Sequence, residues 1–344
     1  MNSTVAFAYA KQQLPPDIRL ADRPELFAVL RKFDLDPVVT LGGEAAYHPD
    51  YIRTTDVMGN ADSVIDASRV GAVVNRLNRS FKLDLLGGFS IPATVNENAV
   101  RKLGWNKDIA AEQVFKPLGY SLPTALVTTP EDVDTFLGSQ KQKYFITKPR
   151  HGNFGAGTTI HTRDTLAQHY TQFPDQLGKH VIQPALDLTK AFPRYVKPLD
   201  RQSTPKFEEL NTAGTVKELR AYGFLSSGGI DVYPAARVLR PSLDGKTQDS
   251  EWFFVDPESL PERVVSQTSY TLKKTAQLTG SAALFGAVDF GYGSDRSSDA
   301  PADWHIIELN VMSPGMIADR QNVTVATELR RLYGRHLRSL VSSP

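Results

Sequence analysis

Residues 144–162, YFITKPRHGNFGAGTTIHT, place a glycine-rich loop between two runs that favour β-structure. The first run, 144–147, ends at a Lys-Pro pair; glycines follow at positions 152, 155 and 157, and the second run starts at 158. Glycine-rich loops often hold phosphates, because backbone N–H groups can approach a ligand where no Cβ intervenes. The same stretch could form a plain hairpin turn. The neighbouring elements of the chain have to distinguish a phosphate-binding loop from such a turn.

The setting excludes three well-known phosphate-binding loops. A Walker A loop needs Gly-Lys-Ser/Thr before a helix, whereas Thr158 and a strand follow Gly157 here. A dinucleotide fingerprint reads G-x-G-x-x-G between a strand and a helix, and this loop reads G-x-x-G-x-G between strands. A protein kinase carries its lysine after the glycine loop and an H-R-D motif before D-F-G; here Lys148 precedes the loop and H-R-D is absent. What remains is a flap between two strands with a lysine before it.

A second group of polar residues interrupts two apolar strands near the end of the chain. Asp289 lies in GAVDFGYG, and Glu308 and Asn310 lie in WHIIELNVM. Residues i and i+2 of a strand share a face, so Glu308 and Asn310 can project into one site. Two carboxylates and an amide oxygen suit Mg²⁺ that bridges nucleotide phosphates. The alternative is a set of strand-end side chains that face water, but an unpartnered buried carboxylate is costly.

Four cations could face such phosphates. Lys107 starts an expected helix, Lys148 ends a strand, and Arg220 and Arg237 lie in two strand-like runs. Two lysines and two arginines would neutralise a transferring phosphoryl group. Each one alone is more often a solvated surface charge.

Composition narrows the class of protein. The chain has 344 residues, a formal net charge of +1 and no dense Lys/Arg tract, which argues against a nucleic-acid partner and against an anionic membrane surface. It has no cysteine, which excludes disulfides, thiol nucleophiles and cysteine-based metal sites. No run approaches the roughly 18 apolar residues of a membrane span, and we see no signal peptide. We therefore expect a cytoplasmic protein.

The order of expected elements divides the chain into three units. Residues 1–97 alternate strands and helices, which predicts an α/β unit with a largely parallel sheet. In this unit 68–89 reads as a long amphipathic helix, with a stripe at Val70, Val73, Val74, Leu77 and Phe81. Residues 98–187 form a small α+β lobe that carries the glycine loop. Residues 188–344 are strand-rich, with a Ser-Gly-Gly hairpin near 226–229 and a closing helix.

In chain order, six motifs resemble those of the ATP-grasp superfamily, and most closely bacterial glutathione synthetase and the ribosomal-protein glutamate ligases. The motifs are NKDIAAEQVFKPLGYSLPTALV, FITKPRHGNFGAGT, HVIQPAL, KELRAYGF with YPAARVLRP, GAVDFGYG and WHIIELNVMSPGM. The resemblance covers about residues 90–320. It implies an ATP-grasp fold of mixed α/β and α+β class, in which 1–97 is a pre-ATP-grasp domain, 98–187 the lid-bearing small lobe and 188–344 the large lobe with the Mg²⁺ site.

The resemblance also implies roles for particular residues. Lys107 and Lys148 would contact phosphates, Asp187 would lie near the ribose, and Arg220 and Arg237 would act catalytically on the γ-phosphate and an acyl phosphate. Asp289, Glu308 and Asn310 would hold two Mg²⁺ ions, with Mn²⁺ as a substitute. The loop over the ATP phosphates would comprise Gly152, Asn153, Phe154, Gly155, Ala156 and Gly157, and the adenine would meet Gln183, Pro184, Ala185 and Leu186.

The implied activity is that of an ADP-forming carboxylate–amine ligase, which makes an amide or peptide bond through an acyl phosphate. The substrates would be a small-molecule carboxylate and an amine, such as an amino acid or peptide. A small-molecule kinase on the same fold and a non-catalytic nucleotide-binding protein stay open as alternatives. Dimers and tetramers are common among the resembled ligases, so a homo-oligomer is compatible with the resemblance. Residues 187–216, longer than the resembled ligases require, leave the substrate open.

Overall fold

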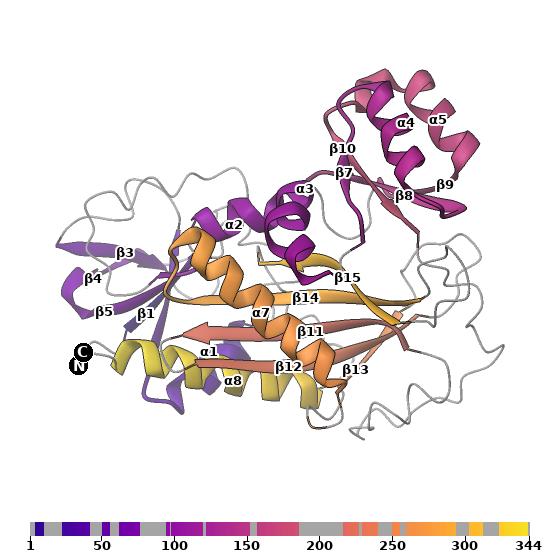
Figure 1. Ribbon diagram of the computed structural model, residues 1–344. Coiled ribbons are helices and arrows are strands. Elements are labelled where there is room, and N and C mark those ends of the chain that lie inside the picture. The colour runs from indigo at the N-terminus through magenta and orange to yellow at the C-terminus, as the bar shows by residue number, and fades with distance from the viewer. Residues whose placement is uncertain are drawn as a thin grey trace.

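Three β-sheets organise the part of the chain that the structure describes (Figure 1). The structure is a computed structural model, and it describes the residues 4–9, 23–41, 50–55, 62–75, 94–96, 98–119, 122–151, 157–185, 216–226, 229–239, 250–254, 258, 260–293, 303–311 and 323–342. No helix within these ranges is long and apolar enough to cross a membrane.

The N-terminal sheet has the strand order β4-β3-β2-β1-β5-β6. Its parallel part, β2-β1-β5-β6, confirms the predicted α/β character, and β3 and β4 extend it as antiparallel edge strands. The elements of this unit are β1 (Thr4–Tyr9), α1 (Arg23–Arg31), β2 (Asp36–Leu41), β3 (Tyr51–Thr55), β4 (Asp62–Asp66), η4 (Ala67–Arg69), β5 (Val70–Asn75) and β6 (Thr94–Val95).

The predicted helix over 68–89 is wrong at its start, because η4 is a single 3₁₀ turn and β5 is a strand. Val70, Val73 and Val74 are at most 2% exposed. A strand inside a parallel sheet is covered on both faces, so its residues are apolar at nearly every position. Such a run also satisfies a helical spacing, which explains the error. Residues 76–89, with Leu77 and Phe81, lie outside the described residues.

The central sheet is antiparallel, with the order β13-β12-β11-β14-β15. The predicted hairpin at 226–229 is confirmed by the antiparallel pairing of β11 with β12, in which Ser226 stands opposite Gly229. Leu219 and Ala221 of β11 pack in the core beneath α7, while Tyr222 and Phe224 pack in the core that α8 covers. The elements are β11 (Val216–Ser226), β12 (Gly229–Leu239), β13 (Ser250–Phe254), α7 (Glu262–Thr279), β14 (Leu284–Gly293), β15 (Asp303–Asn310) and α8 (Val323–Ser342).

The small sheet carries the glycine loop and has the order β7-β10-β8-β9. Helices α4 and α5 cover one face of it (Figure 1), and both begin at a threonine capping box, Thr129 and Thr162. β8, β9, α5 and β10 confirm the predicted strands and helix on either side of the glycine loop, whose residues 152–156 lie outside the described residues. The elements are β7 (Ala125–Leu126), α4 (Pro130–Ser139), β8 (Tyr144–Pro149), β9 (Thr159–Thr162), α5 (Arg163–Gln172), η8 (Pro174–Gln176) and β10 (His180–Pro184).

A short helical segment connects the N-terminal sheet with the small sheet. It comprises α2 (Asn98–Trp105), α3 (Lys107–Ala110), a π turn at Ala111–Phe115 (η6) and a 3₁₀ turn at Lys116–Leu118 (η7). Gly104 lies where α2 meets the end of β15: a Cβ at this position would stand 2.3 Å from Cγ2 of Val311. The glycine therefore permits the close approach that sets the α2–α3 junction against β15.

Buried Asn96 ties the N-terminal sheet to the central sheet. Its side-chain amide donates to the carbonyl oxygens of Phe285 (2.8 Å) and Val311 (3.1 Å), and its Oδ1 accepts from the Phe285 N–H (2.8 Å). Asn96 is 2% exposed and has φ of 58°, a conformation that asparagine tolerates better than most residues. One side chain thus serves three buried backbone groups on β14 and at the end of β15.

We predict that Asn96→Ala lowers the free energy of unfolding by roughly 3 kcal/mol, because three buried backbone groups lose their partner. Urea denaturation measures the loss. Asn96→Gly should cost less than Asn96→Ala, since glycine adopts the positive φ without strain. Asn106→Ala is the control, because the Asn106 amide makes one exposed hydrogen bond, to the Lys102 carbonyl. Equal effects of Asn96→Ala and Asn106→Ala would contradict the assignment.

A second prediction concerns the small sheet and pH. Burial lowers the pKa of His161 from 6.5 to about 4, and the nearby His169 acts in the same direction. The unfolded chain therefore binds the proton more tightly, so the stability that neutral His161 contributes is complete above about pH 6.5. It is lost as the pH falls through about 4. Between pH 7 and pH 4 the unfolding free energy should drop by roughly 2–3 kcal/mol more in the wild type than in His161→Gln. Identical pH profiles from urea denaturation would exclude His161 as the cause.

Candidate active site

Three charged residues form a row across the central sheet. Arg220 on β11 stands opposite Asp289 on β14, and Asp289 stands opposite Glu308 on β15. Directly opposed residues of antiparallel strands share a face, so the three side chains meet on one side of the sheet. Asn310 is paired with Ala287, two residues along β14 from Asp289, and lies on the same face. The register thus brings the predicted set Asp289, Glu308 and Asn310 together, with Arg220 beside it.

Arg220 and Asp289 form a bidentate ion pair. The Nε of Arg220 lies 2.6 Å from Oδ1 of Asp289, and its Nη2 lies 2.7 Å from Oδ2. The two side chains are 11% and 15% exposed. Burial by itself would lower the pKa of Arg220, but the Asp289 carboxylate outweighs burial and raises that pKa above its ordinary value. The guanidinium is therefore charged, and it neutralises Asp289.

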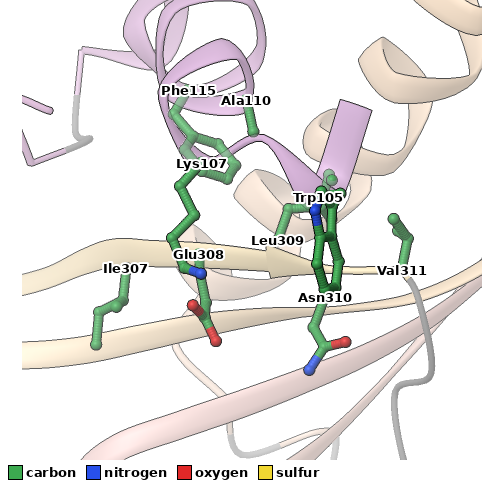
Figure 2. A pocket seen from close by; sticks show the side chains of 10 residues that line it. Trp105, Lys107, Ala110, Phe115, Ile307, Glu308, Leu309, Asn310 and Val311 are labelled. Atoms are coloured by element: carbon green, nitrogen blue, oxygen red, sulfur yellow. The ribbon is translucent and has the colours of Figure 1, made fainter. Parts of the chain in front are cut away.

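Glu308 makes no comparable bidentate ion pair with any residue that the structure describes. Burial and the neighbouring Asp289 carboxylate raise the pKa of Glu308, while Lys148, Lys107 and Arg220 act to lower it. Figure 2 shows the ammonium group of Lys107 close to the Glu308 carboxylate. Lys107 and Lys148, 41 positions apart in the chain, thus act on the same carboxylate. The site gathers three cations around two carboxylates, an arrangement with capacity for a further anion.

The two lysines arrive from different elements. Lys107 is the first residue of α3, as the sequence predicted, and its Nζ donates to the Pro149 carbonyl at 3.3 Å. Lys148 lies on β8, where Phe145 packs in the core beneath α4 and α5. Because successive side chains alternate, Ile146 and Lys148 project from the opposite face of the small sheet. This face is the one that α4 and α5 leave uncovered.

Ile146 is a candidate site residue that the sequence reasoning missed. It is half-buried and stands opposite Gln183 on β10, so the two residues share the uncovered face with Lys148. Its spacing of two residues from Lys148 in a β-prone run was the available signal. The face therefore offers an apolar surface beside the lysine.

Two of the expected adenine contacts are partly engaged within the protein. Gln183 donates through Nε2 to the Thr124 hydroxyl at 2.7 Å, and its buried Oε1 has no hydrogen-bond partner among the described residues. The N–H of Ala185 donates to the Tyr144 carbonyl at 2.9 Å, and Pro184 has no N–H. Of the predicted backbone donors, Ala185 is therefore already used by the sheet.

Several predicted residues cannot be placed in the site. Arg237 pairs through its backbone position with Glu218 and Trp252 in the central sheet, but its side chain lies outside what the structure describes. Gly157 ends the glycine loop with φ of +73°, and a Cβ there would stand 2.9 Å from Cγ of Pro149. Outside the described residues lie Gly152, Asn153, Phe154, Gly155, Ala156, Leu186 and Asp187.

A pocket opens where the α2–α3 junction faces the end of β15 (Figure 2). Glu308 and Asn310 line it from β15, and Trp105 and Lys107 line it from the helical side. The remaining lining is Gly104, Ala110, Phe115, Ile307, Leu309 and Val311. Polar groups at Lys107, Glu308 and Asn310 therefore lie beside an aromatic and aliphatic wall, as in many ligand sites.

The donor set fits a divalent cation that prefers oxygen. Asp289 and Glu308 are adjacent carboxylates and Asn310 adds an amide oxygen. Because burial and Asp289 raise the pKa of Glu308, a cation between the two carboxylates would stabilise both of them. Within the described ranges no group of three or more His, Cys, Asp or Glu side chains is arranged to hold a metal. The set here is of another kind, with two carboxylates and one amide.

A Ser-His-Asp arrangement occurs elsewhere in the fold. Ser226 Oγ lies 3.0 Å from Nδ1 of His336, whose Nε2 lies 2.9 Å from Oδ2 of Asp231. Ser226 and His336 are each 6% exposed, and neither lines the pocket. A hydrolase nucleophile must be reachable by its substrate. The arrangement instead links α8 to the β11–β12 hairpin.

Comparison with known proteins identifies the fold. No protein-family model and no curated protein sequence matches the chain. Among solved structures, D-cycloserine synthetase DcsG is 15% identical with a TM-score of 0.62, and covers 98% of this chain and 100% of its own. D-alanyl-alanine synthetase A from Vibrio cholerae is 12% identical with a TM-score of 0.60, covering 99% and 98%. The ATP-grasp ligase PsnB, solved with a phosphomimetic variant of its minimal precursor, Mg and ADP, is 13% identical with a TM-score of 0.59, covering 99% and 100%.

We predict that Arg220→Met lowers the free energy of unfolding by roughly 3 kcal/mol, because Asp289 is then a buried carboxylate beside Glu308 without its partner. The double variant Arg220→Met/Asp289→Asn should be more stable than Arg220→Met alone. Urea denaturation of the wild type, Arg220→Met, Asp289→Asn and the double variant completes a double-mutant cycle, which gives the interaction energy of the pair. Additive losses would show that the two side chains do not stabilise each other.

Proposed function

Because this chain has the ATP-grasp fold, we propose that it is an ADP-forming ligase that joins a carboxylate to an amine. The observation that carries the proposal is the row Arg220–Asp289–Glu308 with Lys107 and Lys148 directed at it. Three cations directed at a set of oxygen donors can together bind a nucleoside triphosphate and its metal ion.

Each group has a definite task in this proposal. Asp289, Glu308 and Asn310 would hold Mg²⁺, which when bound neutralises phosphate charge. Lys107 and Lys148 would bind the α- and β-phosphates together with the loop 152–157. The adenine would lie on the uncovered face of the small sheet, against Ile146 and near Gln183, whose unpartnered Oε1 can accept a hydrogen bond from an amino group. Asp187 would lie near the ribose.

The reaction proceeds in two steps. A carboxylate oxygen of the first substrate attacks the γ-phosphorus, the bond to the β-phosphate oxygen breaks, and an acyl phosphate and ADP form. The amine then attacks the acyl carbon, inorganic phosphate leaves, and the amine loses a proton. Arg220 and Arg237 would balance charge on the transferring phosphoryl group. Positioning and charge neutralisation supply most of the catalysis, because phosphoryl transfer needs little covalent help.

The substrates would be amino acids or peptides. Two of the similar structures are synthetases named for D-alanyl-alanine and D-cycloserine, and the third was solved with a variant of its minimal precursor. In this proposal residues 1–97 form the pre-ATP-grasp domain, 98–187 the small lobe and 188–344 the large lobe. Lys107 in the second unit and Glu308 in the third would then act on one nucleotide.

The test is acyl-phosphate trapping. The protein is incubated with ATP, Mg²⁺, a panel of amino acids and peptides, and hydroxylamine, and both ADP and hydroxamate are measured. Hydroxamate that depends on one carboxylate supports the ligase. ADP with a stable phosphorylated product would instead identify a small-molecule kinase, and nucleotide binding without turnover on the whole panel would favour a non-catalytic protein.

We predict that Asp289→Asn and Glu308→Gln each reduce the rate of ADP formation by about 100-fold or more, because each removes a charge that would hold the metal. Glu328→Gln on α8 is the control, since Glu328 forms a solvent-accessible ion pair with Arg331 and is neither part of the row nor in the pocket lining. Circular dichroism and thermal melting establish that the variants are folded. Near-normal rates in folded Asp289→Asn would remove this carboxylate from the metal site.

A further inference from the structure

The segment that leaves β8 toward the glycine loop is fastened to the α2–α3 junction. Nε of Arg150 lies 2.7 Å from Oδ1 of Asp108, and Nη2 lies 2.9 Å from Oδ2. The two side chains are 24% and 17% exposed, so the bidentate pair is largely shielded from water. Such a pair fixes orientation as well as distance, because the guanidinium is planar.

A ring stack accompanies the ion pair. The rings of Trp105 and His151 lie 5.8 Å apart at an interplanar angle of 11°, and Nδ1 of His151 lies 3.4 Å from the Trp105 carbonyl oxygen. On the other side, the Arg150 N–H donates to the Lys179 carbonyl at 2.7 Å, which keeps its backbone in the small sheet. We call Trp105, Asp108, Arg150 and His151 the clasp.

Both lysines lie close to clasp residues in the chain. Lys107 lies between Trp105 and Asp108 in the chain, and Lys148 lies two residues before Arg150. The Lys107 ammonium also donates to the carbonyl of Pro149, the residue between Lys148 and Arg150. The distance between the two ammonium groups therefore depends on how the two short segments 105–108 and 148–151 are joined.

We propose that Asp108 and Arg150 are positioning residues of the nucleotide site, whose ion pair holds Lys107 and Lys148 together over Glu308. Two ammonium groups repel each other, and these two are carried by elements with separate cores: Phe145 packs beneath α4 and α5, whereas Ala110 packs with α7. An opposite-charge pair beside them offsets that repulsion before any phosphate arrives. The inference rests on the proposed function, because it assigns the lysines to ATP phosphates.

The test compares MgATP binding in the wild type, Asp108→Asn, Arg150→Lys and the charge-reversed variant Asp108→Arg/Arg150→Asp. Isothermal calorimetry should show about tenfold weaker MgATP binding in both single variants, a loss of about 1.4 kcal/mol. The reversed pair should recover part of the affinity, since the attraction is restored at the same place. In steady-state kinetics of the single variants, the KM for ATP should rise by a larger factor than the factor by which kcat falls.

The matched control is Glu112→Gln. Glu112 forms an ion pair with Lys116 at 2.6 Å, four residues further along the same helical segment, but both side chains are more than 60% exposed. Exposed pairs of this spacing contribute little. Glu112→Gln should therefore leave MgATP affinity unchanged.

Tryptophan fluorescence supplies a readout that does not depend on turnover. Loosening the clasp should expose Trp105, so quenching by acrylamide should increase in Asp108→Asn and Arg150→Lys but not in Glu112→Gln. The chain has two other tryptophans, Trp252 and Trp304, and these are common to all variants. The rise should be absent when the same substitutions are made in a Trp105→Phe background.

The outcomes separate the two proposals. Wild-type protein that does not bind MgATP overturns the proposed function and the clasp with it. Wild-type binding that both folded single variants retain at full affinity overturns the clasp alone, even if quenching increases, because the ion pair is then only structural. Should a single variant fail to fold, the charge-reversed variant decides: a loss of MgATP affinity smaller than tenfold supports the clasp, and a loss of tenfold or more in a folded protein argues against it.

Discussion

The structure around the candidate site depends on one electrostatic constraint: two carboxylates, Asp289 and Glu308, stand directly opposite each other on neighbouring strands. Burial and mutual repulsion would drive a proton onto one of them unless cations compensate. Arg220 supplies the first cation from the third strand of the same sheet, through two short hydrogen bonds. Lys107 and Lys148 supply the others from outside it. The positions of α3 and β8 thus place Lys107 and Lys148 where they compensate the negative charge of the two carboxylates.

Three sets of contacts along the chain bring Lys107 and Lys148 close to Glu308. Asn96 fastens the end of β6 to β14 and to the end of β15, just before α2 begins. Gly104 then lets α2 approach Val311, which brings Lys107 to β15. The ion pair of Asp108 with Arg150 carries the connection on to β8 and Lys148. A continuous series of buried polar and close-packed contacts thus leads from the N-terminal sheet to both lysines.

Much of the fold could be predicted because its signals are local. The alternation in β11, β14 and β15, the Ser-Gly-Gly turn and the strands around the glycine loop all depend on residues within about ten positions of each other. The error at β5 has the opposite origin: Val70, Val73 and Val74 are apolar because β5 lies inside the sheet, between β1 and β6, where its side chains are buried, and a window of sequence does not contain those neighbours. The proposed adenine surface was incomplete for the same reason, since Ile146 is brought beside Gln183 only by the pairing of β8 with β10.

By itself, the sequence determined that Glu308 and Asn310 share a face, that Lys148 precedes a glycine loop between strands, and that Lys107 starts a helix. Each follows from the period of a single element. Only the tertiary structure decided that Arg220 pairs with Asp289, 69 residues away, and that Arg150 reaches Asp108 across 42 residues. Register between distant strands and the docking of one segment on another arise from packing and charge across the whole molecule. No local pattern in the chain encodes them, because neither partner constrains its own neighbours in a way that reveals the other.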